Sequence, residues 1–197
     1  MQKIILASTS IYRKELLERI GLKFSICKPI VNEEKLKFDL LNDLKTPIEI
    51  AEELSWAKAW SIHADSNTTI IAGDQLVEFE NQIIGKPLTT DLAIKQLMAF
   101  NGKTHKLITS VVIIKGHLKF NLNHISTLKM KKLTESEIKK YVQIDQPLDC
   151  AGSYKIEQCG IALFDEIKTD DFTAIQGLPL IWISQKLREM GHELFDK

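Results

Sequence analysis

The sequence has few cysteines, no excess of charge of either sign and no long apolar run. Its three cysteines, Cys27, Cys150 and Cys159, form neither a CxxC pair nor an even disulfide set, so we expect reduced thiols. No stretch approaches the roughly 18 apolar residues of a membrane-spanning helix, and the apolar start Ile4–Ala7 is far shorter than a secretory signal requires. These absences predict a soluble protein of the cytoplasm.

The charged residues balance. The 26 Lys and Arg residues equal the 26 Asp and Glu residues in number, so the formal net charge is zero. Proteins that bind nucleic acid electrostatically carry a basic excess that displaces counterions, so this class is disfavoured. A small anionic ligand held by a few local Lys and Arg side chains remains compatible with the composition.

Several common catalytic motifs are also missing. The chain has no Walker A sequence, no GxGxxG and no GxSxG elbow, which disfavours P-loop, dinucleotide-binding and α/β-hydrolase chemistry. Its five histidines show no metal-ligand spacing, so a zinc site is not expected. What remains are hard anionic and cationic side chains without an evident nucleophile. That set suits Mg²⁺-assisted hydrolysis of a phosphate compound.

The chain has the length and composition of an ordinary globular protein. Its 197 residues are 44% hydrophobic and 26% charged, with no repeat or linker, which predicts a single domain over residues 1–197. Strands and helices are expected to alternate, with a hairpin turning at residues 80–81, so we predict a mixed α/β sheet flanked by helices. The expected strands cover residues 3–7, 68–72, 76–79, 82–84, 104–115, 117–133 and 161–167. The expected helices cover residues 11–20, 47–63, 90–101, 134–142 and 179–190, and the charged stretch 32–43 stays unassigned.

The first candidate group is the run Ser8-Thr9-Ser10, between the first strand and the first helix, with Arg13 one turn later. Backbone N–H groups at the start of a helix attract an anion, and a guanidinium matches phosphate oxygens. The competing interpretation is that Ser10 merely caps the helix.

The second candidate is Asp74, which follows Gly73 after a strongly apolar strand. A carboxylate at a strand end could hold Mg²⁺, orient water or act as a base. The competing interpretation, at about even weight, is an aspartate that ends the strand in a turn.

Three further positions could assist. Lys86 lies in Gly85-Lys86-Pro87, where the proline forces an extended backbone. Lys58 lies in the middle of the second helix beside its apolar stripe. Glu33 follows Asn32 in a presumed loop and could supply a second carboxylate. For Lys86 and Glu33 a solvated surface charge is the commoner alternative.

Taken in order, the motifs resemble those of the Maf-like nucleoside triphosphate pyrophosphatases over residues 3 to about 190. The residues that carry the resemblance are Ile4-Ile5-Leu6-Ala7-Ser8-Thr9-Ser10, Arg13-Lys14-Glu15-Leu16-Leu17, Lys58-Ala59, Gly73-Asp74-Gln75, Gly85-Lys86-Pro87, Gly102-Lys103-Thr104-His105, Ala151-Gly152-Ser153-Tyr154 and Gly177-Leu178-Pro179-Leu180. The resemblance implies an α/β fold with an elongated curved mixed sheet, a deep cleft and a homodimer.

The resemblance also implies a reaction that depends on a divalent metal cation, Mg²⁺ or Mn²⁺. A nucleoside triphosphate and water would give the monophosphate and pyrophosphate. Asp74 would accept the proton of the attacking water, and Glu33 with Asp74 would hold the metal. The substrate phosphates would be bound by Ser8, Arg13, Lys58 and Lys86.

The sequence departs from the family pattern at two positions. Ile11 stands where the family usually has proline, which leaves helix initiation intact because proline there only presets φ. Asn32 stands where the family usually has aspartate, so one metal ligand or neighbouring charge would be weaker.

The base pocket resembles that of the subgroup acting on 7-methyl-GTP, through Tyr12, Gln75 and Glu157. The 7-methylguanine ring is cationic, so it would gain from stacking on Tyr12 and from the negative charge of Glu157. Two other functions stay open: a pyrophosphatase for dTTP, UTP or modified pyrimidines, and an inactive nucleotide-binding regulator of cell division.

Overall fold

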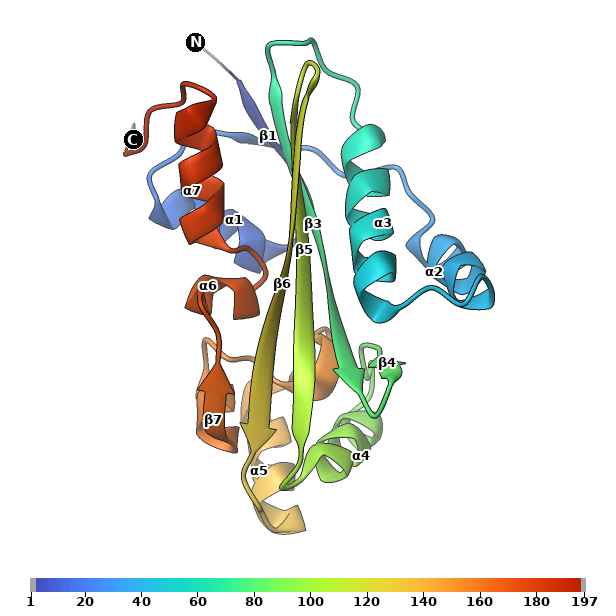
Figure 1. The fold of residues 1–197 in the computed structure, drawn as a ribbon. Helices are drawn as coiled ribbons and strands as arrows, with labels where there is room; N and C mark the ends of the chain where they lie inside the picture. The colour runs from blue at the N-terminus through green and yellow to red at the C-terminus, as the bar shows by residue number, and fades with distance from the viewer. Residues whose placement is uncertain (1–2, 196–197) are drawn as a thin grey trace. The chain divides into compact units, whose positions relative to one another are not determined.

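The computed structural model describes residues 3–195 (Figure 1). These residues contain one seven-stranded sheet, in which the strands follow the order β2-β1-β3-β5-β6-β7 and β4 pairs with β3. The strands are β1 (Ile4–Ala7), β2 (Ser25–Ile26), β3 (Thr69–Phe79), β4 (Gln82–Ile84), β5 (Thr104–Lys115), β6 (Leu118–Met130) and β7 (Phe164–Lys168). The helices are α1 (Ile11–Arg19), α2 (Glu33–Asn42), α3 (Pro47–Trp60), α4 (Thr90–Phe100), α5 (Glu135–Asp145), α6 (Phe172–Ile175) and α7 (Leu180–Glu189), with 3₁₀ turns η1 (Ala151–Ser153) and η2 (Cys159–Leu163).

The sheet is mixed. Strand β1 pairs in parallel with β2 and with β3, whereas β4 pairs antiparallel with β3 and β7 pairs antiparallel with β6. Helices flank this open sheet, so the predicted α/β class is confirmed. Within residues 3–195, no helix has the length and apolar character needed to cross a bilayer.

The described chain divides into two compact units. Unit 1 comprises residues 3–74, 109–124 and 171–195, and unit 2 comprises residues 75–108 and 125–170. Strands β3, β5 and β6 each contribute residues to both units. The expectation of a single domain over residues 1–197 stays a prediction.

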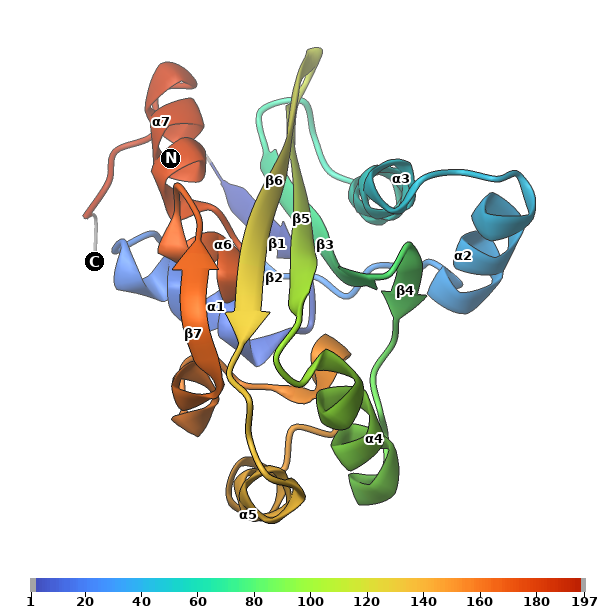
Figure 2. The ribbon, with the colours of Figure 1, turned by 60° about the horizontal axis from the view of Figure 1, so that its bottom comes forward.

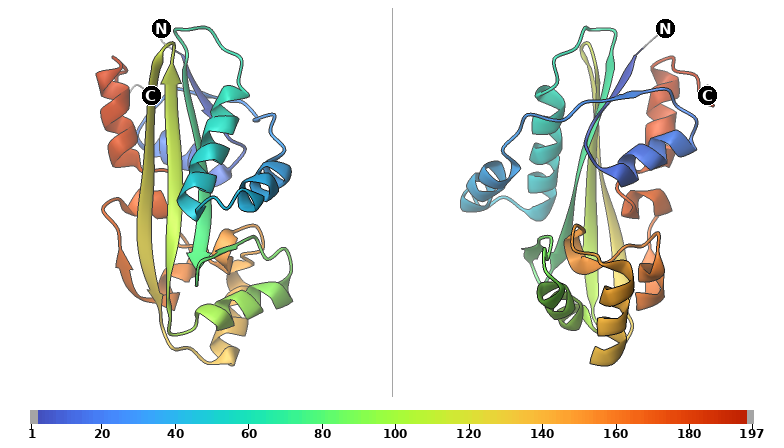
Figure 3. Two further views of the ribbon diagram at one scale, coloured as in Figure 1. Left: turned by 45° about the vertical axis from the view of Figure 1, so that its right-hand side comes forward. Right: turned by 180° about the vertical axis from the view of Figure 1, so that it is seen from behind.

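Unit 1 is built in three layers, with α1 and α7 on one face of the strands and α3 on the other (Figure 3). Side chains of a strand alternate between its two faces. In β3, Ile71 accordingly packs with Leu17 of α1 and Ile183 of α7, while Ile70 and Ala72 pack on the α3 side. Both faces of this part of the sheet are therefore buried.

In unit 2, helices α4 and α5 pack against one another (Figure 2). The same unit contains a cluster of aromatic side chains. His105 of β5 stacks on Phe100 with ring centroids 4.6 Å apart, and it also contacts the rings of Tyr154 and Phe164. Phe79 meets Phe100 edge to face at 4.9 Å. This cluster ties β3, β5 and β7 to the segment after η1.

Most of the expected elements are confirmed. The hairpin turns at Glu80 and Asn81, which both adopt positive φ, and Phe79 pairs with Gln82. The helix expected from residue 134 is α5, which begins with a capping box between Thr134 and Glu137.

Several expected boundaries are wrong. Strand β3 does not end at residue 72 but continues to Phe79. The stretch 32–43 contains helix α2, and the last expected strand begins only at Phe164 because residues 159–163 form the turn η2. Helix α4 ends at Phe100, one residue earlier than expected, and Thr89 is its N-cap. Helix α6 was not expected, and it is a single short turn with little periodicity to detect.

Candidate functional site

The alternation of side chains between the two faces of β3 determines the direction of the Asp74 side chain. Residues 70, 72 and 74 share one face of the strand, and Ile70 and Ala72 pack on the side of α3. Helix α3 begins with a complete capping box between Thr46 and Glu49. Its buried stripe includes Lys58, which therefore faces Asp74.

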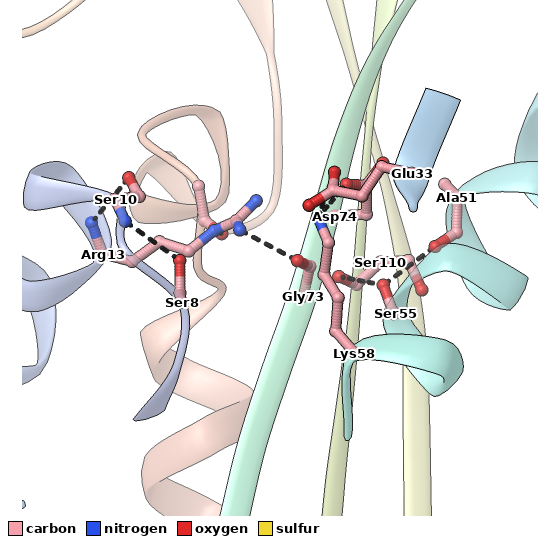
Figure 4. Close-up of polar contacts among 11 residues, drawn as sticks. Ser8, Ser10, Arg13, Glu33, Ala51, Ser55, Lys58, Gly73, Asp74 and Ser110 are labelled. Atoms are coloured by element: carbon pink, nitrogen blue, oxygen red, sulfur yellow. Dashed lines mark hydrogen bonds and ion pairs between the residues drawn. The ribbon is translucent and has the colours of Figure 1, made fainter. Parts of the chain in front are cut away.

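The ammonium group of Lys58 joins two carboxylates (Figure 4). Its Nζ lies 2.6 Å from Oδ1 of Asp74 and 2.8 Å from Oε2 of Glu33. The side chains of Lys58 and Asp74 are only 7% and 10% exposed, whereas that of Glu33 is 51% exposed. Lys58 thus forms a buried ion pair with Asp74 and a second ion pair with Glu33, whose side chain is half exposed at the surface.

Glu33 is positioned by the start of α2. Asn32 is the N-cap of this helix, and its Oδ1 accepts a hydrogen bond of 3.0 Å from the backbone N–H of Lys35. The expected loop at Glu33 is therefore wrong: Glu33 stands in the first helical turn, where negative charge is favoured by the helix dipole. Asparagine caps a helix as well as aspartate does, so this function survives the departure at residue 32.

Lys37, one turn after Glu33 on α2, is a charged group that the sequence analysis missed. Burial lowers the pKa of Lys37 from its ordinary value, and the carboxylate of Asp74 opposes this shift. Lys37 is therefore a further cation in the electrostatic surroundings of Asp74. It could have been found only by recognising α2, since residues four apart share a helix face.

Arg13 of α1 binds backbone carbonyls on two other segments. Its Nη1 donates to the Gly73 carbonyl at 2.8 Å, and its Nε donates to the Gly177 carbonyl at 3.1 Å. Burial lowers the pKa of Arg13, and the carboxylates of Asp74 and Glu33 work to raise it. Arg13 thus fixes β3 next to Asp74, and within residues 3–195 its other N–H groups make no further hydrogen bond.

The serines before α1 support the chain as it enters this helix. Ser10 is the N-cap, as the structural interpretation of this run expected, and its hydroxyl accepts from the backbone N–H of Arg13. Ser8 is buried, and its Oγ accepts a hydrogen bond of 3.1 Å from the backbone N–H of Ser10. These bonds set the direction in which α1 leaves β1.

Ser55 is a buried polar residue of α3 that the sequence analysis did not single out. Its hydroxyl bonds the carbonyls of Ala51, at 2.8 Å, and of Ser110 in β5, at 3.1 Å. It joins α3 to the sheet one turn before Lys58. A polar residue on an otherwise apolar helix stripe is the signal that could have marked it.

The other expected site residues lie elsewhere. Tyr12 is half-buried near the start of α1 in unit 1. Gln75 in β3, Lys86 in the loop after β4 and Glu157 in a turn before η2 all belong to unit 2. Glu157 and Lys86 are exposed, and Gln75 is half-buried.

An open hollow of about 840 Å³ adjoins the charged group of unit 1. Residues 28–34 line it, so Glu33 both faces the hollow and contacts Lys58. The three cations Arg13, Lys37 and Lys58 are thus gathered around the carboxylates of Asp74 and Glu33. Such a group can bind an anion, and a carboxylate within it can accept a proton.

Comparison with known proteins agrees with these features. A 7-methyl-GTP pyrophosphatase of Bdellovibrio bacteriovorus is 50% identical over 186 residues, which cover 94% of this chain and 96% of the relative. A 7-methyl-GTP pyrophosphatase of Xanthomonas oryzae pv. oryzae is 36% identical over 195 residues, covering 98% and 100% of the two chains. The solved structure of a HAM1 protein from Coxiella burnetii covers 96% of this chain and 100% of its own, with 13% identity and a TM-score of 0.45, a likeness too weak to bear on fold or function. The model of the Maf-like protein family matches residues 3–190, and the chain belongs to this family.

Proposed function

We propose that this chain hydrolyses 7-methyl-GTP to 7-methyl-GMP and pyrophosphate and so removes a modified nucleotide. The observation that carries the proposal is the buried Asp74, whose Oδ1 is held by Lys58 while Lys58 also binds Glu33. Relatives that cover nearly the whole chain are named 7-methyl-GTP pyrophosphatases, which supports the choice of substrate.

Asp74 is the proposed proton acceptor for the attacking water. Lys58 fixes Oδ1, and Oδ2 makes no hydrogen bond within the described residues 3–195, so Oδ2 is free to take the proton. The water would attack the α-phosphorus, and pyrophosphate would leave. Such a base contributes about 10²–10⁴-fold to the rate.

The substrate carries several negative charges, which need several cations. Ser8, Arg13, Lys58 and Lys86 are the proposed phosphate-binding residues, and Lys37 adds positive charge near Asp74. Because charge grows on the departing pyrophosphate, cations near it lower the barrier.

A divalent cation, Mg²⁺ or Mn²⁺, fits the donors at this site. Glu33 and Asp74 supply hard carboxylate oxygens that meet at one ammonium group, and Mg²⁺ is commonly held by one or two carboxylates together with substrate phosphates. Within residues 3–195 no three acidic, histidine or cysteine side chains gather around one point, so these two residues would need the phosphates as further ligands. When bound, the cation would neutralise charge on the phosphates.

The base preference rests on Tyr12, Gln75 and Glu157. Stacking of a cationic 7-methylguanine on Tyr12 would add a cation–π contribution of ~0.5–2 kcal/mol. The carboxylate of Glu157 can accept two N–H bonds from the guanine edge, and its charge favours a cationic base. A homodimer in the cytoplasm is part of the same proposal, and light scattering of the purified protein would test the dimer.

The test is a nucleotide panel assayed for pyrophosphate release with Mg²⁺. We expect 7-methyl-GTP to be hydrolysed faster than GTP, dTTP and UTP, and Asp74→Asn to lower turnover at least about 100-fold while nucleotide binding persists. The matched control is Asp39→Asn, which changes an exposed aspartate of α2. Rapid dTTP hydrolysis without 7-methyl-GTP hydrolysis would overturn the substrate choice. Nucleotide binding without any release of pyrophosphate would favour the regulator.

A further inference from the structure

Lys86 stands on a loop whose backbone is held from both ends. The loop joins β4 to α4. Within residues 3–195 the ammonium group of Lys86 makes no ion pair. Pro87 is buried, and Leu88 adopts a positive φ of 61°. Because the Lys86 side chain is exposed and makes no ion pair among the described residues, its position depends on the position of the loop backbone.

Two hydrogen bonds hold this backbone, both within unit 2. The backbone N–H of Leu88 donates to the Leu148 carbonyl at 3.1 Å. On the other side of Lys86, Nε2 of Gln96 in α4 donates to the Gly85 carbonyl at 3.1 Å. Lys86 therefore lies between two fixed points.

The amide of Gln96 is itself held by the hydroxyl of a buried serine. Its Oε1 accepts a hydrogen bond of 2.5 Å from Oγ of Ser153. The Gly85 carbonyl can only accept, so it requires the amide N–H of Gln96 on its side, and the Ser153 hydroxyl then donates to the amide oxygen at the other end. The hydroxyl of Ser153 thus holds the amide group in place while its N–H groups face the loop.

Burial and a backbone hydrogen bond fix the position of Ser153, so it can hold Gln96 in place. It is fully buried with φ of 64°, and its backbone N–H donates to the Cys150 carbonyl at 3.1 Å. The next residue, Tyr154, bonds His105 at 3.1 Å within the aromatic cluster. The relay Ser153–Gln96–Gly85 therefore runs from the core of unit 2 to the loop that carries Lys86.

We propose that Gln96 and Ser153 are positioning residues that hold Lys86 in place for the phosphates of the substrate. The inference rests on the proposed function, because it takes Lys86 as a phosphate-binding residue. Neither residue would touch the reacting atoms. Their effect would pass through the Gly85 carbonyl, and displacement of a binding group by about 1 Å can cost up to about 100-fold in rate.

The test is a double-mutant cycle. Gln96→Met keeps the side-chain length but loses both hydrogen bonds, and Ser153→Gly removes the hydroxyl at a φ that glycine adopts freely. We expect each change to lower kcat/KM for 7-methyl-GTP about 10-fold. In a Lys86→Met background, Gln96→Met should cause no further loss, because the group it positions is gone.

The control is Lys95→Met, which changes the exposed neighbour of Gln96 on the same helix and should leave kcat/KM unchanged. A second measurement does not depend on activity: amide hydrogen exchange at residues 85, 86 and 88 should accelerate in Gln96→Met and not in Lys95→Met. Unchanged exchange in Gln96→Met would overturn the inference even if the enzyme proved inactive. Equal losses with and without Lys86 would overturn it when the enzyme is active, because Gln96 would then act by another route. Absence of pyrophosphate release by the unmodified protein would count against the proposed function alone.

Discussion

At the scale of single residues, His105 is a titratable group inside an apolar cluster. It is 2% exposed and stacks on Phe100, its Nε2 bonds the hydroxyl of Tyr154, and its Nδ1 has no partner among the described residues. Burial lowers the pKa of His105 from 6.5 to about 4. The folded protein therefore favours the neutral form of the His105 ring.

This shift predicts how stability depends on pH. Between pH 6.5 and pH 4 the unfolded chain binds a proton at His105 that the folded chain does not, so the free energy of unfolding falls as the pH falls. Above pH 6.5 both states are neutral and the effect vanishes, and below pH 4 it amounts to roughly 3 kcal/mol. We expect His105→Gln, which keeps a partner for Tyr154, to flatten this part of the profile. Urea titrations from pH 4 to 8 measure it.

The comparison isolates His105 because the other titrating groups are common to both proteins. Burial also lowers the pKa of His192, which bonds Thr69 at 2.8 Å, and this contribution cancels in the difference. Parallel profiles for the two proteins would show that His105 does not titrate as described.

At the scale of secondary structure, β3 depends on a glycine in its interior. A side chain at Gly73 would place its Cβ 2.9 Å from the Ser110 carbonyl and 3.3 Å from Cγ2 of Val111. Gly73 therefore allows β5 to approach closely, and its own carbonyl is free to accept from Arg13. A glycine inside a strand commonly marks such a close approach.

We expect Gly73→Ala to destabilise the protein by about 1–3 kcal/mol, because the added methyl group must displace backbone atoms. The matched control is Gly85→Ala, where the new Cβ meets no atom within 4 Å and stability should not fall. Thermal or urea unfolding of both variants provides the measurement. A Gly73→Ala protein as stable as the unmodified one would mean that the strands separate easily at this point.

The sequence predicted most elements but misplaced the strand that carries Asp74. Glycine followed by aspartate is typical of a strand end, so β3 was expected to stop at residue 72. Its continuation depends on the neighbouring β5, which no local pattern records. The contact between Asp74 and Lys58 was not predicted, because it follows from the continued alternation of side chains along β3, which places Asp74 on the face covered by α3.

The part of the site on α2 could not be predicted in the same way. The stretch 32–43 mixes charges of both signs and exposes several apolar residues, so its helical period is weak. Asn32 followed by two acidic residues is nonetheless a helix-start signal. Recognising it would have placed Glu33 in a helical turn and brought Lys37 into consideration.

At the scale of the whole molecule, the two compact units share their central strands. Residues 69–74 of β3 belong to unit 1 and residues 75–79 to unit 2, and β5 and β6 are divided in the same way. Each of these strands is an unbroken element, so the boundary falls inside secondary structure and not in a linker. Independent domains are instead joined by exposed linkers that few contacts cross.

We therefore expect both units to unfold in one cooperative transition, as a single domain would. The three tryptophans, Trp56, Trp60 and Trp182, all lie in unit 1, so tryptophan fluorescence reports that unit, while hydrogen exchange in α4 and α5 reports unit 2. Coincident urea midpoints from the two measurements indicate two-state behaviour. Gly73→Ala, a change in unit 1, should lower both midpoints together. Residues 69–74 and 75–79 form one continuous strand, so loss of β3 from unit 1 also disturbs the part of β3 in unit 2. Separate midpoints, or a shift confined to fluorescence, would show instead that the shared strands do not couple the units.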